Sequence, residues 1–184
     1  MLVKNYSSHI GIMGAGIAGL TAACALKLQG IDSVVFEREN QVSEYGAGIS
    51  ISPNALRPLE KLGLRDVLIS KSFLPEKSTL HYRGKEIYSL KNQVVTSSRK
   101  TLIGALHQKF IDLGGEVLFG FECESLDQDS CEIVFKNGEI HKVSHILACD
   151  GIKSSIRERH THSLGKPVYS GYSAWRGIGT SDLK

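Results

Sequence analysis

Three glycines near the amino terminus lie in the segment Gly14-Ala15-Gly16-Ile17-Ala18-Gly19, which has the pattern G-x-G-x-x-G. This spacing is typical of nucleotide binding. Between a strand and a helix, the first glycine of this pattern permits a tight turn and the second lets backbone approach a pyrophosphate. The third lets the helix pack closely on the strand. The helix amino terminus adds free N–H groups and a positive dipole end. The pattern therefore predicts a dinucleotide pyrophosphate site, provided that the flanking elements are present.

The flanking residues supply those elements. Residues 9–13 are an apolar run typical of a buried strand, and apolar residues at helical spacing follow from Ile17 until Gly30. Residues 33–36 predict a second buried strand that ends at Glu37, 18 residues after the third glycine. An acid at this place can accept hydrogen bonds from ribose hydroxyls and favours a free 2′-hydroxyl, hence FAD or NAD over NADP.

A second stretch of small residues, Gly46-Ala47-Gly48-Ile49-Ser50, could let a flat ligand lie against the backbone. A flexible loop explains its composition equally well. Ser52-Pro53 then predicts a helix start, with the serine as cap and the proline at the first helical position, and Gly63 ends that helix.

The remaining elements alternate between short strands and helices. Arg83-Gly84 predicts a hairpin between residues 80–82 and 85–88, and Arg99 precedes an apolar-striped helix that ends at Gly114. Strands are expected over 116–119, 122–126 and 131–135. Asn137-Gly138 predicts a type I′ turn that pairs 139–143 with the preceding strand.

Asp150 is the second acidic candidate. Residues 146–149 predict an apolar strand that delivers Asp150-Gly151 to a turn before a helix over 154–159. An aspartate at the carboxyl end of a parallel strand lies where α/β sheets bind ligands. A helix-capping aspartate is the alternative.

Composition excludes several classes of protein. Among 184 residues, 22 Lys and Arg face 19 Asp and Glu, and a net charge of +3 is too small to argue for nucleic acid binding. The uncharged run 10–26 resembles a secretion signal but is short for a membrane span, and its glycines have the explanation above. No metal-ligand spacing is present, and we expect reduced thiols in a cytoplasmic protein from Cys24, Cys123, Cys131 and Cys149.

Taken in order, the motifs resemble the class A FAD-dependent flavoprotein monooxygenases, the p-hydroxybenzoate hydroxylase-like family, and most of all its salicylate and urate hydroxylase-like members. The blocks that carry the resemblance are Gly14–Gly19 with Glu37-Arg38, Gly46 to Ala55 with Leu62-Gly63-Leu64, Ser98-Arg99, Ala148-Cys149-Asp150-Gly151 with Ser154, Ser155 and Arg157, and Tyr169-Ser170-Gly171-Tyr172 with Trp175-Arg176-Gly177.

The resemblance implies an α/β fold with a Rossmann-like FAD-binding domain, made of a mostly parallel sheet, helices and a β-meander. This domain would cover residues 1–170, with the hairpin 79–89 leaning on the substrate domain. Residues 171–184 would form the first strand of that α+β substrate domain.

The resemblance also implies roles for individual residues, with FAD as cofactor. The pyrophosphate would be held by Gly14, Ala15, Gly16 and Gly19. Glu37 would bind the adenosine ribose, with Arg38 beside the adenine and Cys123 on a strand whose backbone meets it. Gly48 belongs to the small-residue stretch beside the cofactor, and Arg99 matches an arginine on the ribityl-phosphate side. Asp150 would serve FAD and the nicotinamide cofactor, supported by Arg157. No catalytic residue is identified.

The implied activity is NAD(P)H-dependent hydroxylation of a small aromatic or heteroaromatic substrate. Family members are considerably longer and carry a second Gly-Asp motif, a dipeptide absent from this sequence. We therefore expect an amino-terminal portion that is not an efficient hydroxylase alone.

Two alternatives stay open at this point. One is another FAD oxidoreductase, such as a reductase or halogenase, against which the blocks at Pro53-Asn54-Ala55 and Trp175-Arg176-Gly177 argue. The other is a non-catalytic nucleotide-binding remnant, or half of a protein that assembles as a homo-oligomer or with a complementing chain.

Overall fold

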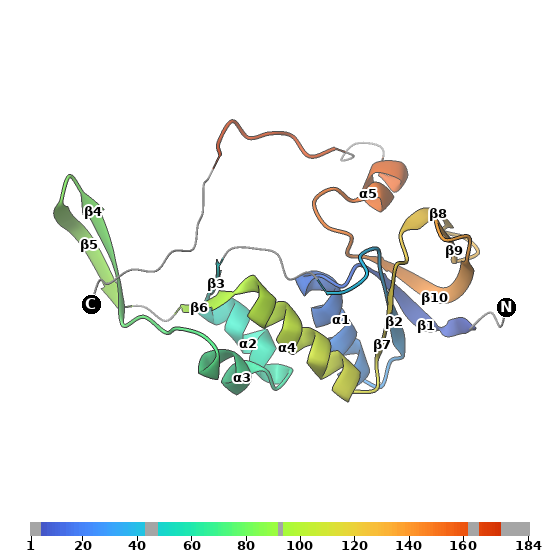
Figure 1. Cartoon of the computed structure of the whole chain (residues 1–184), viewed down its shortest axis with the longest axis horizontal. Coiled ribbons are helices and arrows are strands. Elements are labelled where there is room, and N and C mark those ends of the chain that lie inside the picture. Colours follow the sequence, from blue (N-terminus) through green and yellow to red (C-terminus); the bar gives the residue numbers. More distant parts are fainter. Residues whose placement is uncertain (1–4, 43–47, 92–93, 162–165, 174–184) are drawn as a thin grey trace. The chain divides into compact units, whose positions relative to one another are not determined.

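The computed structural model describes residues 5–42, 48–91, 94–161 and 166–173. The chain divides into two compact units, which are described separately (Figure 1). The first combines Met1–Ser43 with Leu106–Ala174, and the second combines Glu44–Ala105 with Trp175–Lys184.

A six-stranded sheet forms the centre of the first unit, in the order β7-β2-β1-β10-β9-β8. Its four strands from β7 to β10 pair in parallel, whereas β10, β9 and β8 form an antiparallel meander. The strands are β1 (Tyr6–Met13), β2 (Ser33–Glu37), β7 (Glu116–Phe119), β8 (Cys123–Asp127), β9 (Glu132–Phe135) and β10 (Ile140–Ala148). The expected α/β class, a mostly parallel sheet with a meander, is thus confirmed.

One long strand replaces two that the sequence predicts. The expected strands 139–143 and 146–149 fall, except for residues 139 and 149, within the continuous β10. This strand pairs antiparallel with β9 from Ile140 to Lys142 and parallel with β1 from Val143 to Ala148. The polar residues Ser144 and His145 lie between the two expected strands and interrupt the apolar pattern. Ser144 instead stays in the strand, where its hydroxyl donates a hydrogen bond to the His9 carbonyl at 2.8 Å.

The predicted type I′ turn at Asn137-Gly138 is wrong. Only Gly138 has a positive φ, of 83°, and its N–H donates to the Phe135 carbonyl. This is a three-residue loop that closes with a left-handed glycine, not the two-residue turn that needs two positive φ values. The turn with two positive φ values lies at Arg83-Gly84, at 51° and 77°.

Helices α1 (Ile17–Leu28), α4 (Arg99–Asp112) and α5 (Ser155–His160) follow strands. Helix α1 packs against the sheet through Leu20, Ala23 and Cys24, which are buried (Figure 1). Strand β2 is buried along Ser33 to Phe36, which explains its continuous apolar run. Phe36 of β2 also belongs to an aromatic cluster, in which Phe36, Phe121 and Phe135 surround the buried His141.

The second unit contains two small sheets and two helices. Strands β3 (Gly48–Ile51) and β6 (Val95–Ser98) pair antiparallel, as do β4 (Lys77–Tyr82) and β5 (Lys85–Lys91). The flexible loop considered for residues 46–50 is therefore wrong for 48–50, which are strand because β6 pairs with them; residues 46 and 47 lie outside the described part. Helix α3 (Arg65–Ser70), which the sequence did not predict, follows the helix that begins at Pro53.

Helix α2 (Pro53–Lys61) begins at the predicted proline and ends before Gly63, whose φ is 73°. Ser52 is the N-cap residue, as expected, but its hydroxyl donates to the Asn54 side chain and makes no capping hydrogen bond with the helix backbone.

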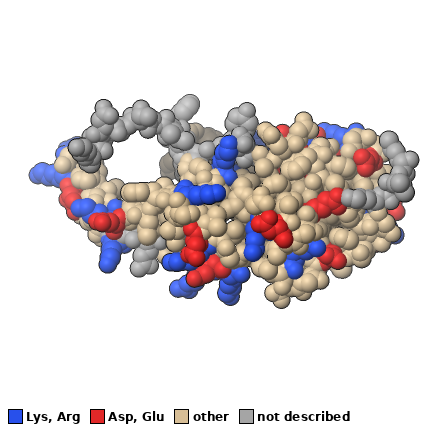
Figure 2. Space-filling model, turned by 60° about the horizontal axis from the view of Figure 1, so that its bottom comes forward, with Lys and Arg blue, Asp and Glu red and all other residues tan. Residues whose placement is uncertain are grey.

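Charge is distributed without a dominant sign. On the face shown in Figure 2, Lys and Arg side chains are interspersed with Asp and Glu. Among the described residues, no helix is both long enough and apolar enough to cross a membrane.

Candidate nucleotide-binding site

Two of the fingerprint glycines are required by packing inside the protein. Gly14 has a φ of 108°, and a Cβ there would lie 2.7 Å from the Cys149 carbonyl oxygen. A Cβ on Gly19 would lie 1.9 Å from the Gly14 carbonyl oxygen. These glycines bring the end of β1 against the end of β10 and the first turn of α1 against the loop.

Gly16 differs from both, because a Cβ there would have no neighbour within 4 Å. It is the N-cap residue of α1, its backbone is extended, and no side chain caps the helix. The first turn of α1 also contains no acidic residue. The helix start therefore combines N–H groups that no side chain caps, a favourable dipole and open space beside Gly16, an arrangement that suits an anion.

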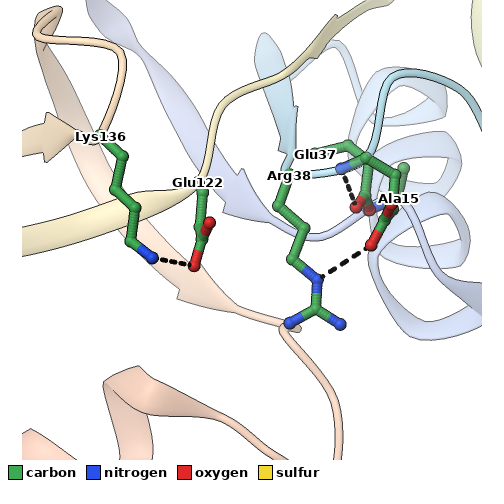
Figure 3. Close-up of polar contacts among 6 residues, drawn as sticks. Ala15, Glu37, Arg38, Glu122 and Lys136 are labelled. Atoms are coloured by element: carbon green, nitrogen blue, oxygen red, sulfur yellow. Dashed lines mark hydrogen bonds and ion pairs between the residues drawn. The ribbon is translucent and has the colours of Figure 1, made fainter.

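Glu37 lies at the carboxyl end of β2 and points back towards the loop (Figure 3). Its Oε2 accepts a hydrogen bond from the Ala15 N–H at 2.7 Å, and its Oε1 accepts one from the Glu39 N–H at 3.0 Å. Arg38 is exposed, and its Nε lies 3.5 Å from Glu39 Oε1. A second surface ion pair, between Lys136 and Glu122, appears in the same view.

Asp150 adjoins the loop, since its Cα would lie 3.4 Å from a Cβ on Gly14. Its carboxylate accepts hydrogen bonds from the Ser154 hydroxyl at 2.6 Å and from the Ile156 N–H at 3.4 Å. Asp150 thus stabilises the start of α5. This agrees with the alternative role of Asp150 as a helix-capping residue. Arg157 donates to the carbonyl oxygens of Gly151 and Ile152 and so supports this turn.

Cys123 begins β8 and pairs with Phe135. Its thiol donates weakly to the Ser125 carbonyl at 3.6 Å. Burial raises the pKa of this thiol, opposed by the positive charge of Arg159. The predicted contact with adenine would be made by the backbone of Cys123 at the start of β8, not by its thiol.

Gly48 and Arg99 come together in the second unit. Gly48 pairs with Ser98 across β3 and β6, and Arg99 follows directly as the first residue of α4. The Ser98 hydroxyl accepts a hydrogen bond from the Thr101 N–H at 3.0 Å and so caps α4. Both Gly48 and Arg99 are exposed.

The structure therefore gathers most of the first unit's predicted residues at the carboxyl ends of β1, β2 and β10. Sequence reasoning missed the carbonyl of Cys149 and the N–H of Glu39, two backbone groups that no residue type could signal. Within the described ranges, no three His, Cys, Asp or Glu side chains form a group that could hold a metal ion.

Comparison with known proteins gives a consistent result. The FAD binding domain family matches residues 7–175. A 3-amino-4-hydroxybenzoate 2-monooxygenase from Streptomyces cremeus is 28% identical over 92% of this chain and 46% of its own length. An FAD-dependent urate hydroxylase from Klebsiella oxytoca is 31% identical over 91% of this chain and 46% of its own.

Solved structures agree with the sequence comparison. The tetrameric form of 2-methyl-3-hydroxypyridine-5-carboxylic acid oxygenase superposes with a TM-score of 0.77 at 28% identity, covering 83% of this chain and 42% of that one. The chain thus spans less than half the length of these relatives. The match over residues 7–175, together with the strand, glycine loop, helix and acid seen above, shows that the chain belongs to the FAD binding domain family of the class A flavoprotein monooxygenases.

Proposed function

We propose that this chain binds FAD at the carboxyl ends of β1, β2 and β10, as the FAD-binding portion of an NAD(P)H-dependent monooxygenase that hydroxylates a small aromatic or heteroaromatic substrate. The observation that carries the proposal is the open space at Gly16 before an uncapped helix, next to a strand that ends in Glu37. The aromatic and heteroaromatic substrates in the relatives' names support the substrate class.

The residues present fit the cofactor. Pyrophosphate oxygens would be held by N–H groups of the α1 start beside Gly16, while Gly14 and Gly19 shape the loop. Glu37 would accept from ribose hydroxyls, since each carboxylate oxygen keeps a free lone pair beside its backbone contact. The other positions proposed to contact FAD are Arg38, Gly48, Arg99, Cys123 and Asp150. Ala15 is proposed to act as part of the loop backbone, because its amide is bonded to Glu37.

FAD supplies, when bound, the redox chemistry and oxygen activation that no side chain provides. The role of this chain is to bind and orient it. Asp150 holds the turn before α5 in place through Ser154 and Ile156, so that the turn has a defined position beside the glycine loop. The proposed role of Asp150 towards the nicotinamide cofactor would use this same turn.

We further propose that residues 1–170 form the FAD-binding domain and that residues 171–184 begin the substrate domain. The hairpin β4–β5 supports the expected contact with that substrate domain. Leu80, Tyr82 and Tyr88 of the hairpin are more than half exposed, and an isolated two-stranded hairpin is only marginally stable in water. Packing against the substrate domain would cover these side chains.

The relatives' names favour a monooxygenase over a reductase, a halogenase or a non-catalytic remnant. Self-association is proposed on one observation, a relative whose structure is described as tetrameric. A cytoplasmic location is proposed from the thiols, which are all free among the described residues.

Calorimetric titration with FAD, followed by competition, tests the cofactor site. We expect ADP to compete with FAD, because the first unit carries the residues proposed for the adenosine diphosphate half, and FMN to compete far less. Absence of FAD binding, or FAD binding that ADP does not reduce, would overturn the proposal.

A further inference from the structure

The end of β2 satisfies two consecutive amides of the glycine loop. The Gly14 N–H donates to the Phe36 carbonyl at 2.7 Å, and the next amide, of Ala15, donates to the Glu37 carboxylate at 2.7 Å. Ala15 is 3% exposed, so water has little access to its amide. Removal of the Glu37 carboxylate would therefore leave a buried N–H group without a hydrogen-bond partner, which costs free energy. One strand thus holds both amides of the loop.

These contacts divide the loop's amides into two groups. The amides of Gly14 and Ala15 are used inside the protein and are not available to a phosphate. The amides that follow Gly16 belong to the start of α1, which no side chain caps. The carboxylate of Glu37 holds the Ala15 amide, two residues before the first residue of α1.

We propose that Glu37 is a positioning residue for the glycine loop, and that this role is separate from its contact with a ribose. A hydrogen bond from an N–H to a carboxylate is stronger than one between neutral groups, and it fixes the loop across 22 residues of sequence. The inference rests on the proposed function, in which the loop binds a nucleotide pyrophosphate.

The proposal makes a prediction that a ribose contact alone does not. Removing a carboxylate near a diphosphate lowers electrostatic repulsion and should strengthen binding of any diphosphate. A residue that acts only on the ribose should matter for ADP and not for 2′,3′-dideoxy-ADP. A residue that positions the loop should matter for both nucleotides.

The experiment compares ADP and 2′,3′-dideoxy-ADP by calorimetry on the wild-type chain, Glu37→Ala and Glu39→Ala. We expect Glu37→Ala to weaken binding of the dideoxy nucleotide about tenfold or more, the range of one lost charge-assisted hydrogen bond. Glu39→Ala removes the same charge two residues away and should change both affinities less than threefold. Unchanged affinity of Glu37→Ala for the dideoxy nucleotide would overturn the proposal.

Amide hydrogen exchange of the unliganded chain gives a second readout. The Ala15 amide should exchange at least tenfold faster in Glu37→Ala than in the wild type, while Glu37→Gln, which keeps one acceptor oxygen, should restore part of the protection. Equal Ala15 exchange in all three proteins would contradict the positioning role. If the wild type binds neither nucleotide, the proposed function fails, and this exchange measurement alone decides the proposal about Glu37.

Discussion

At the scale of single residues, the three fingerprint glycines are needed for different physical reasons. Gly14 and Gly19 leave room for backbone carbonyl oxygens of the protein, whereas a Cβ at Gly16 would have no neighbour within 4 Å, so the space beside it is open to a ligand. The same residue type in one motif is therefore required by packing at two positions, and at the third we propose that it serves binding.

Gly19→Ala should destabilise the fold. Its Cβ would lie 1.9 Å from a backbone oxygen in the turn that joins β1 to α1, and backbone at that point has no room to move without separating the helix from the sheet. We expect a loss of about 3 kcal/mol or more in the free energy of unfolding, measured by urea denaturation. An unchanged denaturation midpoint would show that the loop is not packed as described.

Cys24 should make stability depend on alkaline pH. Burial raises the pKa of its thiol to about 11, from 9.0. Between these values the unfolded thiol ionises and the folded one does not, so stability is full below pH 9 and falls as pH rises to about 11. The loss attributable to Cys24 should be roughly 2–3 kcal/mol.

Denaturation of the wild type and Cys24→Ala between pH 8 and pH 11 measures this contribution. The variant is expected to be less stable at pH 8 because it lacks a packed side chain, and to lose less stability on going to pH 11. Parallel curves for the two proteins would contradict the assignment. The buried hydroxyl of Tyr6, whose pKa burial also raises, affects both proteins equally.

Residue identity predicted the loop and its acid but not all of their contacts. Gly14, Gly16, Gly19 and Glu37 follow from spacing alone. The Cys149 carbonyl that Gly14 meets could not be foreseen, because its position depends on how β10 pairs with β1, more than a hundred residues earlier in the chain. The bond from Ala15 to Glu37 depends in the same way on the register of β2.

At the scale of elements, α4 carries a glycine with no packing role. Gly104 lies inside the helix, is exposed, and would meet no atom within 4 Å if it carried a Cβ. Gly104→Ala should therefore raise the free energy of unfolding by about 0.5–1 kcal/mol, because alanine loses less backbone entropy in a helix. Thermal denaturation measures this gain, and a lower Tm would mean that the helix needs flexibility at this point.

Helix α5 depends on Ser154. Its hydroxyl oxygen accepts a hydrogen bond from the Arg157 N–H at 2.9 Å, and the same hydroxyl donates to Asp150. Ser154→Ala should cost about 1–2 kcal/mol and speed amide exchange within α5. The control is Ser155→Ala, one residue further along, which should have a smaller effect on exchange; the reverse order of effects would exclude Ser154 as the cap.

Elements with strong local signals were predicted well, and those defined by distant partners were not. Strands β1 and β2 and helices α1, α2 and α4 carry apolar periodicity and glycine ends. Strand β3 has no such pattern and is a strand because β6 lies beside it. The two halves of β10 form one strand because each half pairs with a different neighbour, β9 for the first half and β1 for the second. The polar residues Ser144 and His145 between the halves hide this continuity in the sequence.

At the scale of the whole molecule, the residues proposed for the adenosine side of the cofactor lie in one unit, and further proposed cofactor residues lie in the other. Gly14, Gly16, Gly19, Glu37 and Asp150 lie in the first unit, and Gly48 and Arg99 lie in the second. The chain also covers less than half the length of its relatives. Binding of FAD and hydroxylation of a substrate are therefore separate questions, and the first can be tested directly.

The most direct test is the visible absorption spectrum of the chain after incubation with FAD and gel filtration, for the wild type, Gly16→Ala and Gly104→Ala. Alanine fits without a clash at both positions, but only at Gly16 does its methyl group enter the space proposed for the pyrophosphate. We predict that flavin absorbance elutes with the wild type and Gly104→Ala and is lost from a folded Gly16→Ala. Equal flavin absorbance in all three proteins, or none in the wild type, would contradict binding of FAD at this loop.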